Sequence, residues 1–431
     1  MSETEFGWQS LLHTDAPPAC SLKAALFTTY DRADERLLAE HLLPLLLRLS
    51  REPDGDGDER QYFLLELDRR LKQLHDRLIV VSSTAREEPA SSGERESGAY
   101  GWIWRSIRHL TVGSCGKAVQ HAKLWLLHWG APSADDVEYL EIVVSSANLT
   151  RDAFRDQLQS AWRACIALHP GRSESRLASW GVLPEFLRQL AASAGDDTRL
   201  SPFVELLARA DRPAGVTFVA SVPGTHSPRT LRRTPWGAAG LGAIAPSGQG
   251  TVSVSILAPY VGSWRTGSLR KWCDMFDGSP DHLALVWIDK EHPWAGQWVL
   301  PKHTLTTLAT LGATLLHLPR VYVNTDFHAE HRQEDVRWSH AKIYSFRRGH
   351  SRRLLVTSAN FSTAAWGCVS PTGELTIENF ELGVCVEQAH GPFSSREEFD
   401  GDEDGRSAHR EERAEHGYCL GPWRSASGDS I

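Results

Sequence analysis

Apolar and polar positions along the chain follow both the strand and the helix period, and together they predict a mixed α/β protein. An apolar run at 22–29 and dense leucines at 34–49 indicate a strand followed by a buried helix that bends at Pro44. The other elements predicted in this part are strands at 78–83, 110–112, 121–128, 139–145, 162–168 and 216–221, and helices at 62–77, after Asn148 and at 184–192. Such mixing predicts a largely buried sheet that is covered on both faces.

The same plan returns after a stretch rich in Gly, Pro, Thr and Arg at 223–250. Strands are predicted at 252–259, 282–288, 313–318, 341–346, 354–358 and 382–387, with a helix at 268–276. Two polar stretches, 51–60 and 86–98, are predicted to be loops. We therefore expect a lead-in at 1–21, a first half at 22–225, a crossover at 226–250, a second half at 251–390 and an acidic, flexible tail at 391–431.

A sequence repeat lies inside these two halves. QHAKLWLLHW and VVSSANLTRDAF in the first half return as SHAKIYSF and LLVTSANFSTAAW in the second. Each copy has a His and a Lys two positions apart, followed by a Ser-Ala-Asn, which gives the set His121, Lys123, Asn148, His340, Lys342 and Asn360. Because residues i and i+2 of a strand point to the same face, each copy should direct an imidazole and an ammonium to one place.

Chance does not account for the repeat. With 19 His and 8 Lys, the pattern His-x-Lys should occur about 0.35 times in an unpatterned chain of this length and composition. It occurs twice, each time within His-Ala-Lys and each time followed by Ser-Ala-Asn. One active site built from two copies is therefore favoured over two unrelated strand ends.

The chemistry of these side chains indicates one class of reaction. Two imidazoles, two ammonium groups and two amides, with no cluster of carboxylates, would bind an oxyanion with several negative oxygens, such as a phosphodiester. One His can attack phosphorus while the other protonates the leaving oxygen. This scheme requires neither a metal ion nor another cofactor.

These motifs resemble those of the phospholipase D superfamily, and within it the tyrosyl-DNA phosphodiesterase family. The superfamily usually has an Asp five positions after the motif Lys, where this chain has His128 and Arg347, and that absence is typical of the tyrosyl-DNA phosphodiesterases. Gln159 in QSAW and Glu381 in FELGV lie where the family places the residues that orient its two His. The resemblance runs from about residue 22 to 386.

The resemblance implies two pseudo-symmetric phospholipase D-like α/β/α sandwich halves with one active site at their interface. It implies that His121 forms a phosphohistidine and that His340 protonates the leaving group and then activates water. The remaining motif residues would hold the nonbridging oxygens, and Gln159 and Glu381 would fix the ring tautomers. The implied activity is the removal of 3′-tyrosyl or other adducts from a single-stranded or frayed DNA 3′ end during DNA repair.

Two family features are missing. No aromatic precedes the first motif at 116–119, and the Ser-rich loop that contacts the DNA backbone has no counterpart at 236–248. A phospholipase D-family nuclease in bacterial repair or phage defence is therefore a second hypothesis, and a non-catalytic binding protein with the same fold is a third. A lipid phosphodiesterase is the least favoured, because the usual motif Asp is absent.

The net charge of −8 does not argue against a DNA partner once its location is considered. The segment 396–415 holds nine acids and four Arg, which accounts for −5 of this charge, whereas Arg residues cluster at 229–233 and 347–353. A solvated tail is favoured over a DNA-mimicking autoinhibitor.

No apolar run is long enough for a bilayer, and 1–10 is too polar for a signal peptide. We expect a cytoplasmic bacterial protein, or a nuclear one if it is eukaryotic, with no membrane partner; no protein partner is indicated.

Other sets of residues predict structure more than chemistry. His328, His331 and His340 do not match a compact metal-ligand spacing, so no zinc site is predicted. The seven Cys lack a CxxC pair and are expected to be reduced, mostly buried thiols. Packing in the core, rather than lining a groove, is the expected role of Trp264, Trp287, Trp294 and Trp298.

Overall fold

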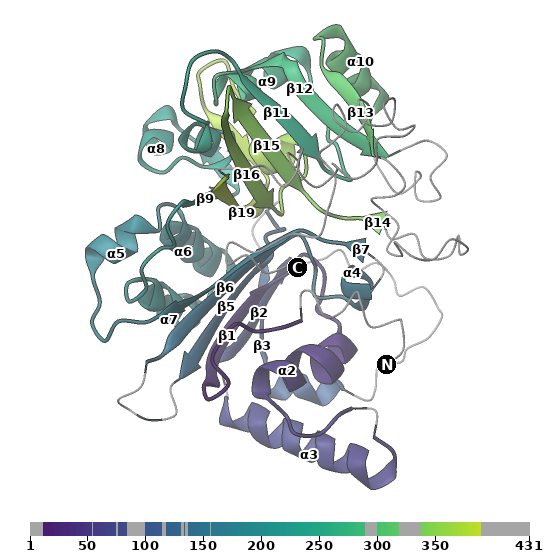
Figure 1. The fold of residues 1–431 in the computed structure, drawn as a ribbon, viewed down its shortest axis with the longest axis vertical. Coiled ribbons are helices and arrows are strands. Elements are labelled where there is room, and N and C mark those ends of the chain that lie inside the picture. The colour runs from purple at the N-terminus through teal and green to yellow at the C-terminus, as the bar shows by residue number, and fades with distance from the viewer. Residues whose placement is uncertain are drawn as a thin grey trace, which may run out of the picture.

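The computed structural model describes residues 12–53, 55–74, 76–83, 100–113, 118–130, 133, 137–155, 157–288, 300–318 and 338–388. It has two halves stacked along the long axis of the molecule, each built on one mixed sheet (Figure 1). The predicted loop at 86–98, the acidic tail, and the residues Trp294, Trp298, His328 and His331 lie outside the described residues, as does the side chain of Trp287.

The two sheets have the same connectivity. The order in the first sheet is β3 (Arg108–Val112), β2 (Leu78–Ser83), β1 (Ser21–Thr28), β5 (Leu124–Gly130), β6 (Tyr139–Ser145) and β8 (Ala161–Ala167). The order in the second is β13 (Thr314–Leu318), β12 (Gly278–Ile288), β11 (Val252–Leu257), β15 (Ile343–Arg348), β16 (Ser351–Thr357) and β19 (Asn379–Gln388). In both sheets the first three strands are parallel to one another and the rest alternate in direction. This repetition confirms the predicted duplication.

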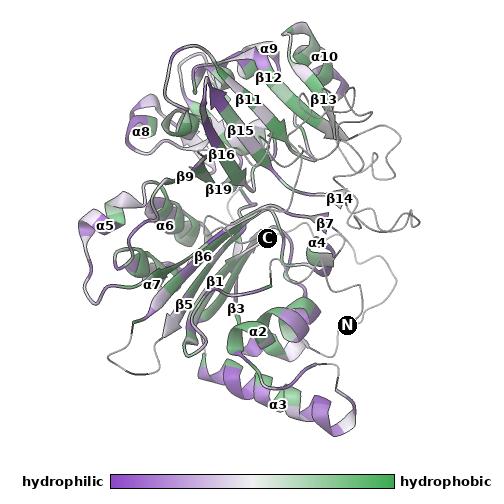
Figure 2. Ribbon diagram, viewed as in Figure 1, coloured by the Kyte–Doolittle hydropathy of each residue, from purple (hydrophilic) through white to green (hydrophobic). Residues whose placement is uncertain are grey.

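Helices cover both faces of the first sheet. The π-helix η2 (Leu37–Leu42) continues into α2 (Leu43–Leu47), which has Pro44 in its first turn. Together with α3 (Gly57–Gln73) these helices pack on one face. The other face carries α6 (Leu183–Ala194) and α7 (Asp197–Leu207). Neighbouring residues of β1 point to opposite faces of the sheet. Phe27 belongs to the apolar core on the α3 side, and Leu26 to the core on the α6 side. Figure 2 shows apolar residues along the strands of both sheets.

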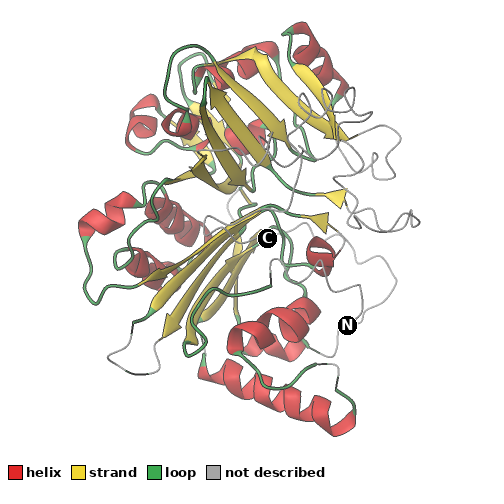
Figure 3. Cartoon of the chain, viewed as in Figure 1, coloured by secondary structure: helices red, strands yellow, loops and turns green. Residues whose placement is uncertain are grey.

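The second sheet is covered on one face by α9 (Thr266–Asp274), α10 (Lys302–Thr310), α11 (Thr363–Trp366) and the 3-10 helix η4 (Gly237–Ile244). An aromatic cluster lies beneath them, in which Trp264 stacks on Phe361 with ring centroids 4.8 Å apart. The core role predicted for Trp264 is confirmed, because its side chain is fully buried. Figure 3 shows helices in red beside and behind the yellow strands of this upper half.

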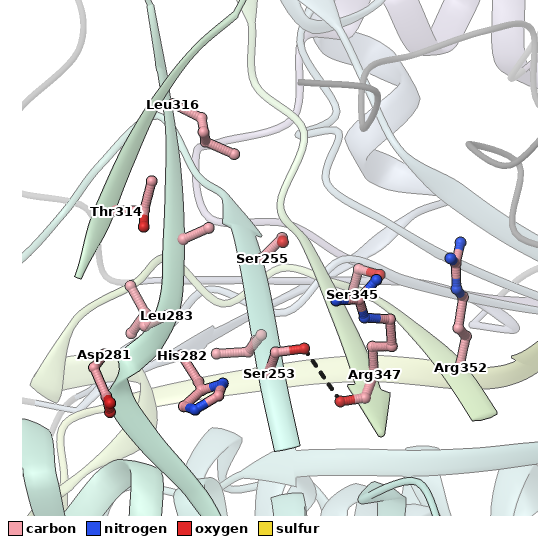
Figure 4. Close-up of a pocket in the computed structure, with 12 residues that line it drawn as sticks. Ser253, Ser255, Asp281, His282, Leu283, Thr314, Leu316, Ser345, Arg347 and Arg352 are labelled. Atoms are coloured by element: carbon pink, nitrogen blue, oxygen red, sulfur yellow. Dashed lines mark hydrogen bonds between the residues drawn. The ribbon is translucent and has the colours of Figure 1, made fainter. Parts of the chain in front are cut away.

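The opposite face of the second sheet differs from the prediction of cover on both sides. Near β19 it packs on the α6 and α7 layer, where Phe186 meets Phe380 with ring centroids 5.9 Å apart. Near β11 and β15 no described helix covers it, and a pocket of about 520 Å³ opens there, with Ser253, Ser255 and Arg347 in its lining (Figure 4). The reason lies in the strand sequence VSVSIL, whose serines alternate with buried apolar residues.

Several element boundaries also differ from the predictions. Strand β9 (Val216–Ser221) pairs with β19 at the edge of the second sheet, although it lies in the range 22–225 expected to form the first half. Helix α3 begins at Gly57, within the predicted loop 51–60. The unpredicted helices α5 (Glu174–Ser179) and α7 precede β9, and the crossover 226–250 contains α8 (Pro228–Arg233) and η4. The described cysteines are all unpaired, and Cys368 is exposed.

Among the described residues, no helix combines the length and the apolar character that a membrane span requires.

A buried carboxylate on β6 ties the first sheet to the N-terminal segment. Glu141 is fully buried, and its oxygens accept hydrogen bonds from Trp129 Nε1 at 2.9 Å and from Arg163 Nη1 at 3.0 Å. The backbone nitrogen of Asp15 donates to the same carboxylate at 3.1 Å. Because β6 leads directly to the first Ser-Ala-Asn, this network also supports the motif.

Replacing Glu141 with Ala should lower the free energy of unfolding by about 3–5 kcal/mol, because it removes the carboxylate that balances the buried guanidinium of Arg163. Glu185→Ala is the matched control, because Glu185 pairs with Arg188 at the surface, and it should change stability by less than about 1 kcal/mol. Urea unfolding of both variants measures the difference. Equal effects of the two substitutions would contradict a structural role for the buried network.

Candidate active site

Two short parallel pairings join the halves and place the two motif histidines. Strand β4 (Val119–Gln120) pairs in parallel with the first two residues of β19. The next residue after β4 is His121, and the next residue along β19 is Glu381, so the two lie side by side. Strand β14 (Trp338–Ser339) pairs in the same way with β7 (Gln157–Leu158), so that His340 lies beside Gln159. Figure 1 shows β7 and β14 next to each other between the halves.

The ring of His121 is oriented by a carboxylate from the second half. Its Nδ1 lies 2.9 Å from Glu381 Oε2, and Glu381 in turn accepts hydrogen bonds from Ser358 Oγ and from Asn379 Nδ2, the latter at 3.0 Å. A carboxylate is an acceptor, so Nδ1 of the neutral imidazole carries the proton. The lone pair is then on Nε2.

The ring of His340 is oriented by neutral acceptors from the first half. Its Nδ1 lies 3.1 Å from the carbonyl oxygen of Ser146 and 3.3 Å from Gln159 Oε1. The amide of Gln159 cannot turn freely, because its Oε1 accepts from Ser146 Oγ at 2.7 Å and its Nε2 donates to the carbonyl oxygen of Ala153 at 3.0 Å. Both atoms that face Nδ1 are acceptors, so the proton of the neutral ring again lies on Nδ1.

Each histidine is therefore oriented from the opposite half, and each orienting residue is held by a serine of its own half. Ser146 and Ser358 are the serines of the two Ser-Ala-Asn motifs, and both are buried. No role was predicted for these serines from the sequence, although their presence in both copies of the repeat was a usable signal.

The two motif lysines are fully buried. Lys123 Nζ donates to the carbonyl oxygen of His121, and Lys342 Nζ to that of His340, each at 2.7 Å. The predicted strands at 121–128 and 341–346 in fact begin at Leu124 and Ile343. The strand alternation predicted from the sequence therefore does not place the lysines. Each lysine side chain instead folds back and donates to the backbone carbonyl oxygen of the histidine in its own motif.

The two asparagines are held differently. Asn148 Nδ2 donates to Asp31 Oδ2 at 2.7 Å, and Asn148 Oδ1 accepts from the backbone nitrogen of Tyr30 at 3.3 Å. Asn360 Oδ1 is buried, with no hydrogen-bond partner in the described part of the chain. The ring of Tyr30 also meets that of His121 edge-on, with centroids 5.3 Å apart. Tyr30 and Asp31 were not predicted from the sequence as site residues; they follow β1 and belong to neither copy of the repeat.

Burial controls the charges in this site. Loss of hydration lowers the pKa of His121 and, together with the nearby lysine charges, holds the pKa of His340 well below its usual value. It also lowers the pKa of Lys123 to about 8, although Glu381 and Asp31 oppose the shift. Burial acts to raise the pKa of Glu381, but His121, Lys123 and Ser358 lower it. The imidazoles are consequently neutral at neutral pH, beside the positive charge of Lys123, which attracts an anion. Burial and the charge of Lys123 hold the pKa of Lys342 well below its usual value.

The described residues contain no group of three or more His, Cys, Asp and Glu side chains arranged to hold a metal ion.

The pocket on the open face of the second sheet is separate from the motifs. Ser253 in its lining pairs with Arg347 at the far end of β15, whereas the motif adjoins Ile343 at the near end. The candidate active site is thus the junction of the two halves.

Comparison with known proteins agrees with this geometry. A sequence model of the tyrosyl-DNA phosphodiesterase family matches residues 59–252 and 296–418, well over half of the chain. No curated protein sequence matches the chain.

Solved structures show the same fold. The yeast tyrosyl-DNA phosphodiesterase superimposes with a TM-score of 0.54 at 15% sequence identity, covering 89% of this chain and 86% of that one. An H432R mutant of the yeast enzyme gives a TM-score of 0.53 at 14% identity, with 88% and 84% covered. With the family model, these findings identify the chain as a phosphodiester hydrolase of a family that acts on DNA. The chain belongs to the tyrosyl-DNA phosphodiesterase family.

Proposed function

We propose that this protein removes tyrosyl or other adducts from single-stranded or frayed DNA 3′ ends, through a phosphohistidine formed on His121. The observation that carries this proposal is the difference between the groups behind the two rings. A carboxylate, Glu381, lies behind His121, whereas neutral acceptors lie behind His340. The same pair of imidazoles is thus given two different electrostatic surroundings, which suits two different roles.

In the first step, Nε2 of His121 attacks phosphorus, and the bond from phosphorus to the leaving phenolic oxygen breaks. The imidazole becomes positively charged, and the carboxylate of Glu381 at 2.9 Å from Nδ1 stabilises that charge. Lys123, Lys342, Asn148 and Asn360 would hold the nonbridging oxygens as charge develops. The product of this step is DNA linked to His121 through its 3′ phosphate.

His340 supplies the proton to the leaving oxygen. Since its Nδ1 already carries the proton of the neutral ring, Nε2 can donate only when the ring gains a second one. The two lysine charges oppose that gain in the empty site, and the negative charge of a bound phosphodiester favours it. Substrate binding therefore prepares the acid.

In the second step the roles reverse at His340. The ring, now neutral, takes a proton from a water molecule that attacks phosphorus, and the bond from phosphorus to nitrogen breaks. His121 is regenerated, and the DNA leaves with a 3′ phosphate. No step requires a metal ion, because the buried lysines provide the positive charge that a metal would otherwise supply.

The substrate assay uses one labelled oligonucleotide, offered with a 3′-phosphotyrosine and with a plain 3′ hydroxyl, in excess EDTA. The expected result is conversion of the first substrate to a 3′ phosphate and no reaction of the second. Internal cleavage of either oligonucleotide would instead support a phospholipase D-family nuclease. Loss of activity in EDTA with recovery on added magnesium or zinc would contradict the two-histidine mechanism.

The two histidines can be separated by trapping the intermediate. His340→Ala removes the proton donor and the base for the second step, but a phenol with a pKa of about 10 leaves tolerably without help. On a denaturing gel this variant should show a DNA-linked protein band, and His121→Ala should show none. The reverse pattern would exchange the two roles, and no band for either variant would contradict the covalent intermediate.

A further inference from the structure

The loop after β1 brings an unexpected carboxylate into the site. Asp31 is partly buried, and its Oδ2 accepts the 2.7 Å hydrogen bond from Asn148 Nδ2. The preceding residue, Tyr30, donates its backbone N–H to the oxygen of the same amide. Adjacent residues of one loop therefore hold both ends of the Asn148 side chain.

These two contacts decide which way the amide faces. If it turned by 180°, its oxygen would lie against the carboxylate of Asp31 and its NH₂ against the N–H of Tyr30, so both contacts would become repulsive. In the observed orientation one N–H is used by Asp31 and the other remains for an oxyanion. The second half has no such arrangement, because the buried Oδ1 of Asn360 lacks a hydrogen-bond partner among the described residues.

We propose that Asp31 is a positioning residue, which holds Asn148 as a hydrogen-bond donor to the phosphoryl group. This inference rests on the function proposed above. It makes the first asparagine a rigid part of the site whose orientation depends on a loop outside both repeats.

The charge of Asp31 matters because Lys123 is surrounded by few compensating groups. Asp31 faces it from the β1 loop and Glu381 from β19, while Lys342 of the second motif faces it with like charge. Burial lowers the pKa of Lys123 to about 8, and the two carboxylates oppose this. Burial raises the pKa of Asp31 itself, but Lys123 and the Asn148 hydrogen bond favour its charged form. Removing the charge of Asp31 must lower the pKa of Lys123 further.

Two substitutions separate the hydrogen bond from the charge. Asp31→Ala removes both and should lower kcat on the 3′-phosphotyrosyl oligonucleotide by about 10-fold to 100-fold, because Asn148 loses its orientation. Asp31→Asn keeps an acceptor oxygen and should lose less at neutral pH. In both variants the alkaline limb of kcat/KM, where Lys123 loses its proton, should move to lower pH. Glu35→Gln is the control, because Glu35 lies four residues further along, in the helical turn that leads into η2, and binds Trp104 and Arg32.

A second readout needs no turnover. The chain has only four Asn, at positions 148, 324, 360 and 379, so protein labelled with ¹⁵N-asparagine gives a simple spectrum of side-chain amides. The Asn148 pair, assigned through Asn148→Ser, should shift as acid protonates Asp31, with a midpoint above 3.8, the usual pKa of the carboxyl. This titration should vanish in Asp31→Asn and persist in Glu35→Gln.

Wild-type kcat and an unshifted alkaline limb in Asp31→Ala would overturn the proposal, as would an Asn148 amide that does not respond to acid. A wild-type protein that ignores the oligonucleotide while its Asn148 amide still titrates would refute the proposed substrate but not the contact between Asp31 and Asn148. The two failures are therefore distinguishable.

Discussion

The site depends on one constraint: neither half of the protein orients its own motif histidine. The Nδ1 atom of His121 faces Glu381 across the junction, and that of His340 faces Ser146 and Gln159 in the other direction. Two-residue parallel pairings set both registers. A shift of either pairing by one residue would replace the orienting group by a neighbour on the other side of the strand. The site is consequently complete only when the two halves are packed against each other.

This junction also sets the protonation of the site. Two imidazoles and two ammonium groups are desolvated together, which lowers the pKa of all four. Buried cations without counter-charges are costly, and Glu381 and Asp31 are the carboxylates that oppose the shift of Lys123. A phosphodiester adds further negative charge where positive charge is least well compensated. The site therefore attracts an anion because its positive charges are incompletely compensated. Its two sides differ in their charged partners, although they come from one duplicated plan.

The duplicated plan could be predicted from a visible repeat, and the eight candidate site residues from that repeat and from matched family positions; the roles of those eight residues stay predictions. The sequence did not predict Tyr30 or Asp31, since their contacts with Asn148 span more than 100 positions and no repeat marks them. It placed β9 with the wrong sheet, because an apolar run shows that a strand is buried but not which strand it pairs with. It expected cover on both faces of the second sheet, whereas no described helix covers the face near β11 and β15, where the serines of VSVSIL lie.

The most direct measurement is the tautomer of His121 in the free protein at neutral pH, read by NMR of ¹⁵N-histidine-labelled protein and assigned through His121→Gln. The hydrogen bond to Glu381 and the lowered pKa of His121 predict a neutral ring with its proton on Nδ1 and a lone pair on Nε2. A proton on Nε2, or a fully protonated ring, would contradict the account, because the atom assigned to attack phosphorus would then have no lone pair.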